Sequence, residues 1–507
     1  MNIKQAKQEI TNTLKAYLAK DQLGNYLIPT VRQRPVLLMG PPGVGKTQIM
    51  EQIAAETGVG LGAYTITHHT RQSAIGLPFI EKRTYGGEEV SVTEYTMSEI
   101  LSSVYRLMER TGLQEGILFL DEINCVSETL APMMLQFLQC KTFGNQALPE
   151  GWLIVAAGNP PEYNKSVRDF DVVTLDRVKR IDVEEDYGVW KEYARRKNLH
   201  GAILSYLDIK KDNFYRIENT ADGLQFATAR GWEDLSELLY AYETLGIRAD
   251  REVVGQYIQM PRIAKDFANY LEMFYKYQKT YHVEGILSGT WENITVLELR
   301  EAPFDEKLSV MGLVLSRLSE EARNTRCQDA LTDALHTSLT EFREKIADAP
   351  PLTVLDQLLW KRRTAMKQAK EAGQLDKESR DLKQREINAL EDYRQRLDRE
   401  AVAPEGAMDA VRGWFGEEVE RRKAVAMETK DMFDNAFRFL ETTFGDSQEL
   451  VIFVTEITVG YNTSWFVEQF GCDAYFRHNR ELLFDSTRHR IREEIAAAKA
   501  AEQEENT

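Results

Sequence analysis

The sequence of 507 residues contains little of what would direct a chain toward redox or metal chemistry. It has only four cysteines, Cys125, Cys140, Cys327 and Cys472, and their scattered positions give no paired spacing for disulfides or a zinc site. Cys472 and His478 would form only half of a metal site, because no second pair accompanies them. These absences predict reduced thiols in a cytoplasmic protein and no structural metal centre.

Excess basic charge and long apolar runs are also missing. Lysine and arginine number 63 against 80 acidic residues, a formal net charge of −17, which disfavours non-specific binding to nucleic acid or anionic membranes. The longest apolar run, residues 450–459, is interrupted by Glu456 and is too short to cross a bilayer. The polar N-terminus carries no signal peptide. We therefore expect a cytoplasmic protein with no membrane association.

What the sequence does contain is the composition of a folded protein, 43% hydrophobic and 28% charged, with room for about two to four domains. It also holds a complete phosphate-binding loop of the form G-x-x-x-x-G-K-[ST]. The loop residues are Gly40, Pro41, Pro42, Gly43, Val44, Gly45, Lys46 and Thr47. An apolar run at 35–39 predicts a buried strand before the loop, and residues 48–55 predict a helix after it.

Each part of this loop has a chemical purpose. Glycines let backbone N–H groups approach a polyphosphate without a Cβ in the way. Lys46 can reach the β- and γ-phosphates, and Thr47 can offer its hydroxyl to Mg²⁺. The sequence therefore predicts ATP and Mg²⁺ as cofactors, although no base-reading residue separates ATP from GTP.

A second apolar run, residues 116–120, ends in two carboxylates, Asp121 and Glu122. Ligands of open parallel sheets bind at the carboxyl ends of the strands, where these two acids would lie. We expect Asp121 to hold hydrated Mg²⁺ and Glu122 to polarise the attacking water.

Further strands are expected at 62–67, 152–157 and 181–183, with a β-hairpin at 77–95 and a helix at 97–111. Asn159 follows the strand at 152–157, so its amide can orient water near a γ-phosphate; an Asx turn before Pro160 is the alternative. This alternation of strands and helices predicts an α/β fold, a parallel sheet with helices on both faces.

The remainder of the chain reads as helical. We predict a nucleotide-binding domain at 1–185, an all-helical lid at 186–289 and a helical C-terminal region at 290–507, with a charged helical arm near 352–403. Arg230 falls in the first turn of a lid helix, where a cation suggests an anionic neighbour; a solvated side chain is the alternative.

These residues resemble the AAA+ ATPases, and within them the MoxR family of the helix-2-insert clade. The resemblance covers about residues 1–285 and rests on the phosphate loop and four runs, at 120–124, 157–160, 175–177 and 229–230. It implies a P-loop αβα sandwich in which Asn159 is sensor 1, Arg177 is the arginine finger and Arg230 is sensor 2.

Two residues depart from the family pattern: Val178 stands where MoxR proteins usually have phenylalanine, and Ala229 stands where proline is usual. Arg168 and Arg180 lie close enough to Arg177 to compete for the finger role, so that choice stays open.

The resemblance further implies a homo-oligomeric ring, in hexameric form, that acts as a chaperone on a protein partner with a von Willebrand factor A domain. Two alternatives remain: a nucleic-acid motor of the restriction or replication type, or a chelatase-like metal-insertion motor. Basic groups such as 82–83 and 361–363 keep the first open, while the charge of −17 counts against it.

Overall fold

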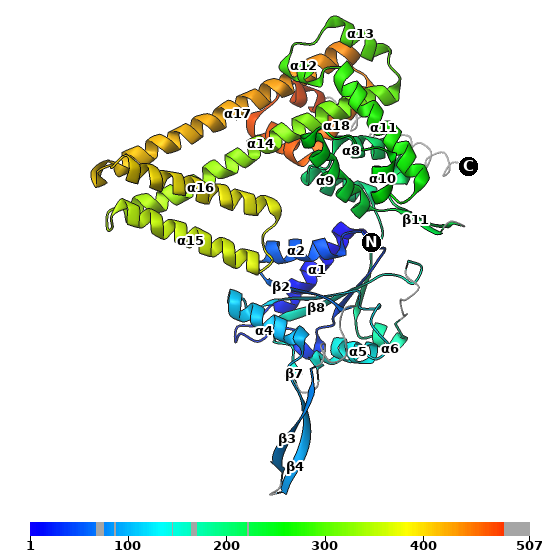
Figure 1. Cartoon of the computed structure of the whole chain (residues 1–507), viewed down its shortest axis with the longest axis vertical. Coiled ribbons are helices and arrows are strands. Elements are labelled where there is room, and N and C mark those ends of the chain that lie inside the picture. The colour runs from blue at the N-terminus through cyan, green and yellow to red at the C-terminus, as the bar shows by residue number, and fades with distance from the viewer. Residues whose placement is uncertain (67–75, 86–87, 144–145, 164–169, 221–222, 481–507) are drawn as a thin grey trace, which may run out of the picture. The chain divides into compact units, whose positions relative to one another are not determined.

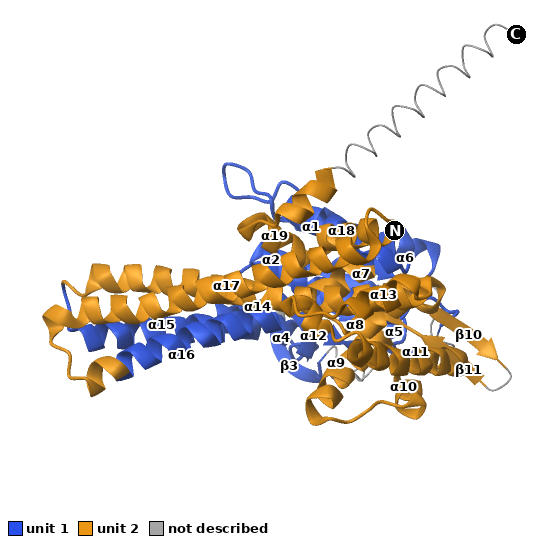
Figure 2. Cartoon of the chain, turned by 90° about the horizontal axis from the view of Figure 1, so that it is seen from above, with its two compact units in different colours: residues 1–189, 348–395 blue, residues 190–347, 396–507 orange. Residues whose placement is uncertain are grey.

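The computed structural model describes residues 1–66, 76–85, 88–143, 146–163, 170–220 and 223–480. The chain divides into two compact units, each built from two stretches of sequence (Figure 2). The first unit combines 1–189 with 348–395, and the second combines 190–347 with the residues from 396 onward. The chain therefore passes between the units three times. The predicted division into three domains stays a prediction.

A five-stranded parallel sheet forms the centre of the first unit. Its strands are β1 (Val36–Met39), β2 (Gly60–Thr65), β5 (Gly116–Asp121), β8 (Trp152–Gly158) and β9 (Lys179–Asp182). Their order is β2-β5-β8-β1-β9, and every neighbouring pair is parallel. The predicted α/β fold with a parallel sheet is confirmed, and the expected strands lie within a few residues of the observed ones.

Helices cover both faces of this sheet (Figure 1). One face packs on α1 (Ile3–Leu18) and α2 (Lys46–Thr57), and the other on α4 (Glu99–Thr111) and α5 (Ala131–Cys140). Strand residues that face α1 and α2 include Val36, Leu38, Ile117, Phe119, Leu153, Val155 and Ala157. Those that face α4 and α5 include Leu37, Met39, Leu118, Leu120, Ile154 and Ala156. Because successive residues alternate between two buried faces, these strands read as continuous apolar runs.

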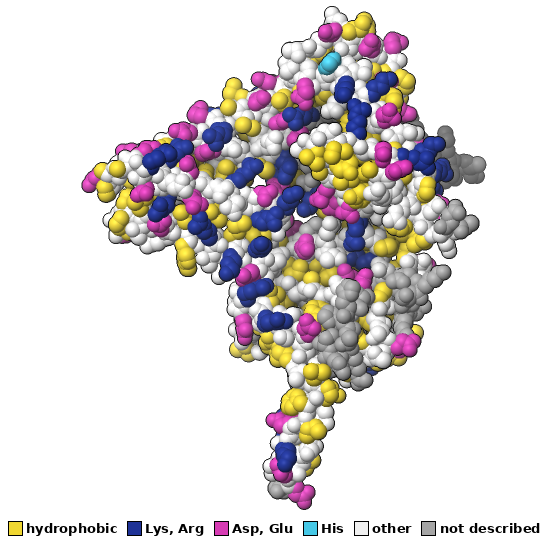
Figure 3. Space-filling model, viewed as in Figure 1, with side chains coloured by type: hydrophobic (Ala, Val, Ile, Leu, Met, Phe, Trp, Pro, Cys, Tyr) yellow, Lys and Arg dark blue, Asp and Glu magenta, His cyan; other side chains and the backbone are white. Residues whose placement is uncertain are grey.

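A long antiparallel hairpin leaves the sheet domain between β2 and α4. It consists of β3 (Pro78–Tyr85) and β4 (Glu88–Tyr95), and its turn at 86–87 lies outside the described residues. The predicted hairpin is confirmed. Phe79, Ile80 and Val90 are exposed on it, and Ile80 is 76% exposed. Figure 3 shows hydrophobic side chains along this ribbon.

The charged arm is a helical hairpin of α15 (Pro351–Glu371) and α16 (Lys377–Arg399). Two ion pairs, Arg362–Glu386 at 2.8 Å and Asp356–Arg394 at 2.8 Å, show that the helices run antiparallel. The turn between them packs within the first unit: Gln374 Nε2 donates to the Val59 carbonyl, and Arg110 of α4 donates to the Glu371 carbonyl. The expected helical arm is therefore present, and its turn is anchored beside β2 and α4.

The second unit is mainly helical. Its helices are α7 (Tyr187–Arg196), α8 (Gly201–Ile209), α9 (Ala229–Leu245), α10 (Arg251–Tyr257), α11 (Pro261–Thr280), α12 (Val283–Ser288), α13 (Asn293–Glu301), α14 (Phe304–Lys345), α17 (Ala407–Phe444), α18 (Gln448–Val459) and α19 (Tyr461–Phe470). The expectation of an all-helical lid is wrong in one place, because β10 (Arg216–Thr220) and β11 (Gly223–Ala227) form a hairpin before α9. These short strands join only one pair of large apolar residues, Ile217 and Phe226, so their sequence has little strand periodicity.

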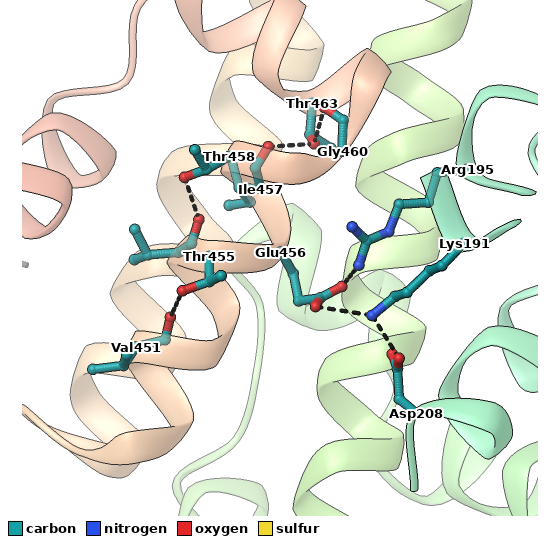
Figure 4. A network of polar contacts seen from close by, with 11 residues as sticks. Lys191, Arg195, Asp208, Val451, Thr455, Glu456, Ile457, Thr458, Gly460 and Thr463 are labelled. Atoms are coloured by element: carbon teal, nitrogen blue, oxygen red, sulfur yellow. Dashed lines mark hydrogen bonds and ion pairs between the residues drawn. The ribbon is translucent and has the colours of Figure 1, made fainter. Parts of the chain in front are cut away.

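Within the second unit, C-terminal helices pack against the helices that follow the sheet domain. Glu456 of α18 lies 3.0 Å from Lys191 Nζ and also contacts Arg195, both on α7 (Figure 4). Lys191 also pairs with Asp208 of α8 at 2.5 Å. Burial lowers the pKa of Lys191 to about 8, since the charged amine loses solvation there. A cavity of about 320 Å³ adjoins this network and is lined also by Met311 of α14.

In the described part of the chain, no single helix has the length and apolar character needed to cross a membrane. The bent pair α18 and α19 meets that test jointly, by length and composition alone, across an 87° bend.

Glycine in β5 makes room for the large side chain of Trp152. A Cβ built on Gly116 would lie 2.5 Å from Trp152 Cζ3 and 2.7 Å from the Gly60 carbonyl oxygen. We therefore expect Gly116→Ala to lower the free energy of unfolding by about 1–3 kcal/mol, the usual effect of overpacking a core. Denaturant unfolding followed by circular dichroism would measure this change.

Gly62→Ala is the matched control, because a Cβ there would meet its nearest atoms at 3.9 Å, which is ordinary contact. It should leave stability unchanged or slightly raised. Equal stability of the two variants would contradict this account of the β5 packing.

Candidate nucleotide-binding site

The loop between β1 and α2 has the backbone geometry of a phosphate cradle. Gly43 and Gly45 adopt positive φ angles of 76° and 95°, which favour glycine. A Cβ on Gly40 would lie 2.9 Å from the Val183 carbonyl oxygen, so that position also requires a residue without a side chain. Helix α2 begins at Lys46, within the last residues of the loop, and its N-terminus favours an anion at this place.

Lys46 is the first residue of α2 and is only 8% exposed. Its Nζ donates to the carbonyl oxygens of Gly40 at 2.7 Å and Pro41 at 2.9 Å. It also donates to Asn159 Oδ1 at 2.8 Å, which joins the end of β1 to the end of β8. The ammonium group is therefore held inside the loop beside the predicted sensor residue.

Thr47 and Asp121 form the group that fits a divalent cation. Thr47 Oγ1 donates to Asp121 Oδ2 at 3.0 Å, and the backbone N–H of Glu122 donates to Asp121 Oδ1 at 2.9 Å. Hydroxyl and carboxylate oxygens are the ligands that Mg²⁺ takes in nucleotide sites. Among the described residues, no group of three or more His, Cys, Asp or Glu side chains is arranged so that it could hold a metal ion by itself. Water and phosphate oxygens would therefore supply the remaining ligands.

Glu122 lies half-buried immediately after β5 and has a φ angle of 57°. This left-handed conformation is uncommon for a residue with a side chain and costs about 1–3 kcal/mol. The surrounding turn holds it: the N–H of Cys125 donates to the Glu122 carbonyl at 2.9 Å. The turn after β5 therefore fixes the backbone of Glu122 at the edge of the sheet.

Sequence reasoning gave no role to Asn124, which the structure connects directly to Asn159. Asn124 is 3% exposed, and its Nδ2 donates to the Asn159 carbonyl at 2.7 Å. Its Oδ1 accepts from the Asn159 N–H at 3.3 Å. The sequence alone shows Asn124 only as a polar amide three residues after Asp121 and next to the apolar Ile123.

The arginine candidates differ in their surroundings. Arg177 follows α6 (Val172–Leu175), is exposed, and donates to the side chain of Gln139. Arg180 on β9 pairs with Asp182 at 2.9 Å, and Arg168 lies outside the described residues. Arg230, exposed in the first turn of α9, belongs to the second unit.

The first unit therefore brings five predicted site residues to one edge of its sheet. They are Lys46, Thr47, Asp121, Glu122 and Asn159. A phosphate loop follows β1, two acids lie at the end of β5, and a polar sensor follows β8, the strand between them. These features define the nucleotide-binding core of a P-loop ATPase.

Comparisons with known proteins agree with this class. Residues 35–178 match the family model described as the AAA domain of the dynein-related subfamily. This segment of the chain is thus similar to an AAA domain, while no curated protein matches the chain. A solved structure of a candidate ATPase from Cytophaga hutchinsonii matches with 18% identity over 38% of this chain. The match covers 56% of that protein, little more than half its length, and its TM-score of 0.24 is too low to support an argument.

Lys46→Ala should weaken nucleotide binding by at least about 1.5–3 kcal/mol, the contribution of one hydrogen bond to a charged group. The loop would lose the cation that lies within it. Titration with a fluorescent ATP analogue would measure the dissociation constant. Lys82→Ala on the exposed hairpin is the control, and equal affinity for both variants would contradict the assignment.

Proposed function

We propose that this chain is a ring-forming ATPase that couples ATP hydrolysis to the remodelling or activation of a partner protein, as MoxR proteins do. The observation that carries the proposal is the contact of Lys46 with Asn159 beside the Thr47–Asp121 pair. These contacts bring a cation, metal ligands and a water-orienting amide within reach of one triphosphate.

Each of these residues would have a separate role in hydrolysis. Lys46 would exchange its carbonyl and amide partners for phosphate oxygens, which are stronger acceptors because they are charged. That exchange would release the side chain of Asn159 to orient a water molecule. Glu122 would polarise the same water for attack on the γ-phosphate. Mg²⁺ held by Thr47 and Asp121 would offset the phosphate charge.

The proposed ring depends on an arginine finger that each subunit supplies to its neighbour. Arg177 is exposed and donates a hydrogen bond to the neutral side chain of Gln139, so a second subunit can reach its guanidinium group. Arg180 is less suitable, because Asp182 on its own strand already neutralises it. A finger from one subunit that completes the site of the next is a head-to-tail contact, which forms a ring when the rotation between subunits closes. In this proposal Arg230 senses the γ-phosphate from the lid.

The proposed partner is a protein with a von Willebrand factor A domain in the cytoplasm. Support comes from the MoxR-like motifs together with helices α14 and α17 to α19, which lie outside the matched domain. The net charge of −17 favours a protein over nucleic acid as the partner.

Glu122→Gln should bind ATP with normal affinity and hydrolyse it slowly, because the amide keeps the shape and loses the basic oxygen. General acid–base groups contribute about 10²–10⁴-fold, so kcat should fall by a factor in that range. A phosphate-release assay would measure it. Glu128→Gln, an exposed residue six positions further on, is the control.

The same Glu122→Gln protein should retain a purified von Willebrand factor A domain partner in the presence of ATP, and Lys46→Ala should not. Hydrolysis at the wild-type rate would contradict the role of Glu122. Equal retention by both variants would instead contradict the coupling of ATP to partner binding.

Arg177→Ala should lower kcat by about 10³–10⁵-fold and leave ATP binding nearly intact, as loss of a finger does in related NTPases. Mixing it with Glu122→Gln should restore part of the activity, since some interfaces would pair an intact Glu122 with an intact Arg177. Arg180→Ala is the matched control. If co-assembled mixtures show no recovery, Arg177 does not act in trans and Arg168 becomes the next candidate.

A further inference from the structure

Asn124 connects two segments that carry the predicted chemistry. It follows β5 and Glu122, and it hydrogen-bonds both backbone polar groups of Asn159, which follows β8. Its side chain is almost fully buried and lies against Gly158, where a Cβ would come within 2.6 Å of Asn124 Oδ1. Glycine at position 158 therefore lets the backbone of β8 lie directly against the Asn124 amide, because a Cβ there would collide with it.

The amide of Asn124 satisfies both of these bonds. One Asn159 group is a donor and the other is an acceptor, so the partner must offer one of each at fixed spacing. An aspartate at this position would place a second oxygen against the Asn159 carbonyl. An alanine would leave the N–H and C=O of Asn159, which are partly buried, without the partners they now have.

The backbone reinforces this connection. The N–H of Ile123 donates to the Ala157 carbonyl at 2.9 Å, which carries the pairing of β5 and β8 past the last strand residue of β5. Glu122 lies between Asp121 and Ile123, so its position relative to Asn159 depends on these contacts. The turn after β5 is thereby joined to β8 and to Asn159 directly after Glu122, at Ile123 and Asn124.

We propose that Asn124 is a positioning residue for hydrolysis: it fixes the backbone of Asn159, and through it the water-orienting amide, relative to the carboxylate of Glu122. The inference rests on the proposed ATPase function. A displacement of about 1 Å between reacting groups can cost on the order of 100-fold in rate. Asn124 touches neither substrate nor metal in this scheme and acts through Asn159.

The test compares Asn124→Asp, Asn124→Ala and wild type in the full-length chain. Asn124→Asp keeps the size of the side chain and the acceptor for the Asn159 N–H, and it loses the donor. Its kcat should fall on the order of 100-fold, as the displacement argument predicts, with the dissociation constant of a non-hydrolysable ATP analogue kept within about twofold. Asn12→Asp in α1 introduces the same charge at an exposed position and should leave kcat unchanged.

A second measurement tests the contact between Asn124 and Asn159 without measuring catalytic activity. Hydrogen exchange at the N–H of Asn159 should remain slow in Asn124→Asp, which retains the acceptor, and become faster in Asn124→Ala. A purely structural role would instead lower kcat, ATP affinity and thermal stability together in both variants, and that result would overturn the proposal.

The outcomes separate this inference from the function on which it rests. A wild-type protein that binds but does not hydrolyse ATP would overturn the ATPase function together with the positioning role. An active wild type with unchanged kcat in Asn124→Asp would overturn the positioning role alone. A loss of kcat in Asn124→Asp with unchanged ATP affinity, together with faster hydrogen exchange at the Asn159 N–H only in Asn124→Ala, supports the positioning role.

Discussion

Parallel pairing of β5, β8 and β1 is the constraint on which the site depends. Parallel strands end at the same edge of a sheet, so segments distant in sequence deliver their following residues to one place. The pairs Met39–Gly158 and Leu120–Ala156 set that register. A slip of one residue would turn every side chain of a strand to the opposite face. Because the two faces pack on different helices, the packing that fixes this register also fixes the positions of the site residues.

The edge residues are held by one another before any phosphate arrives. Lys46 is bound by backbone carbonyls and Asn159, Asp121 by Thr47, and Glu122 by its own turn. Groups fixed in this way need little reorganisation when charge develops in a transition state, and preorganisation of this kind is a large contribution to catalysis. The left-handed Glu122 is the one visible local cost of this arrangement.

Local patterns predicted the parts of the structure that local physics determines. The phosphate loop, the acids after β5 and the hairpin at 78–95 follow from glycine placement and apolar runs, and all lie where expected. The contact of Asn124 with Asn159 was not predictable, because it depends on the register between β5 and β8. The β10–β11 hairpin escaped notice because its strands are short and polar. The packing of α18 on α7 through Glu456 depends on residues 265 positions apart, which no periodicity records.

The insertion of α15 and α16 into the sequence of the second unit has a consequence for synthesis. Residues 1–189 leave the ribosome long before the segment 348–395 that completes their unit. The helices of residues 190–347 emerge in between, before the residues from 396 onward that complete the second unit have been synthesised. Each unit thus closes contacts across a long intervening stretch, which raises contact order and slows folding. Nascent chains of intermediate length expose apolar surface on both units at once, the condition under which large proteins depend most on chaperones.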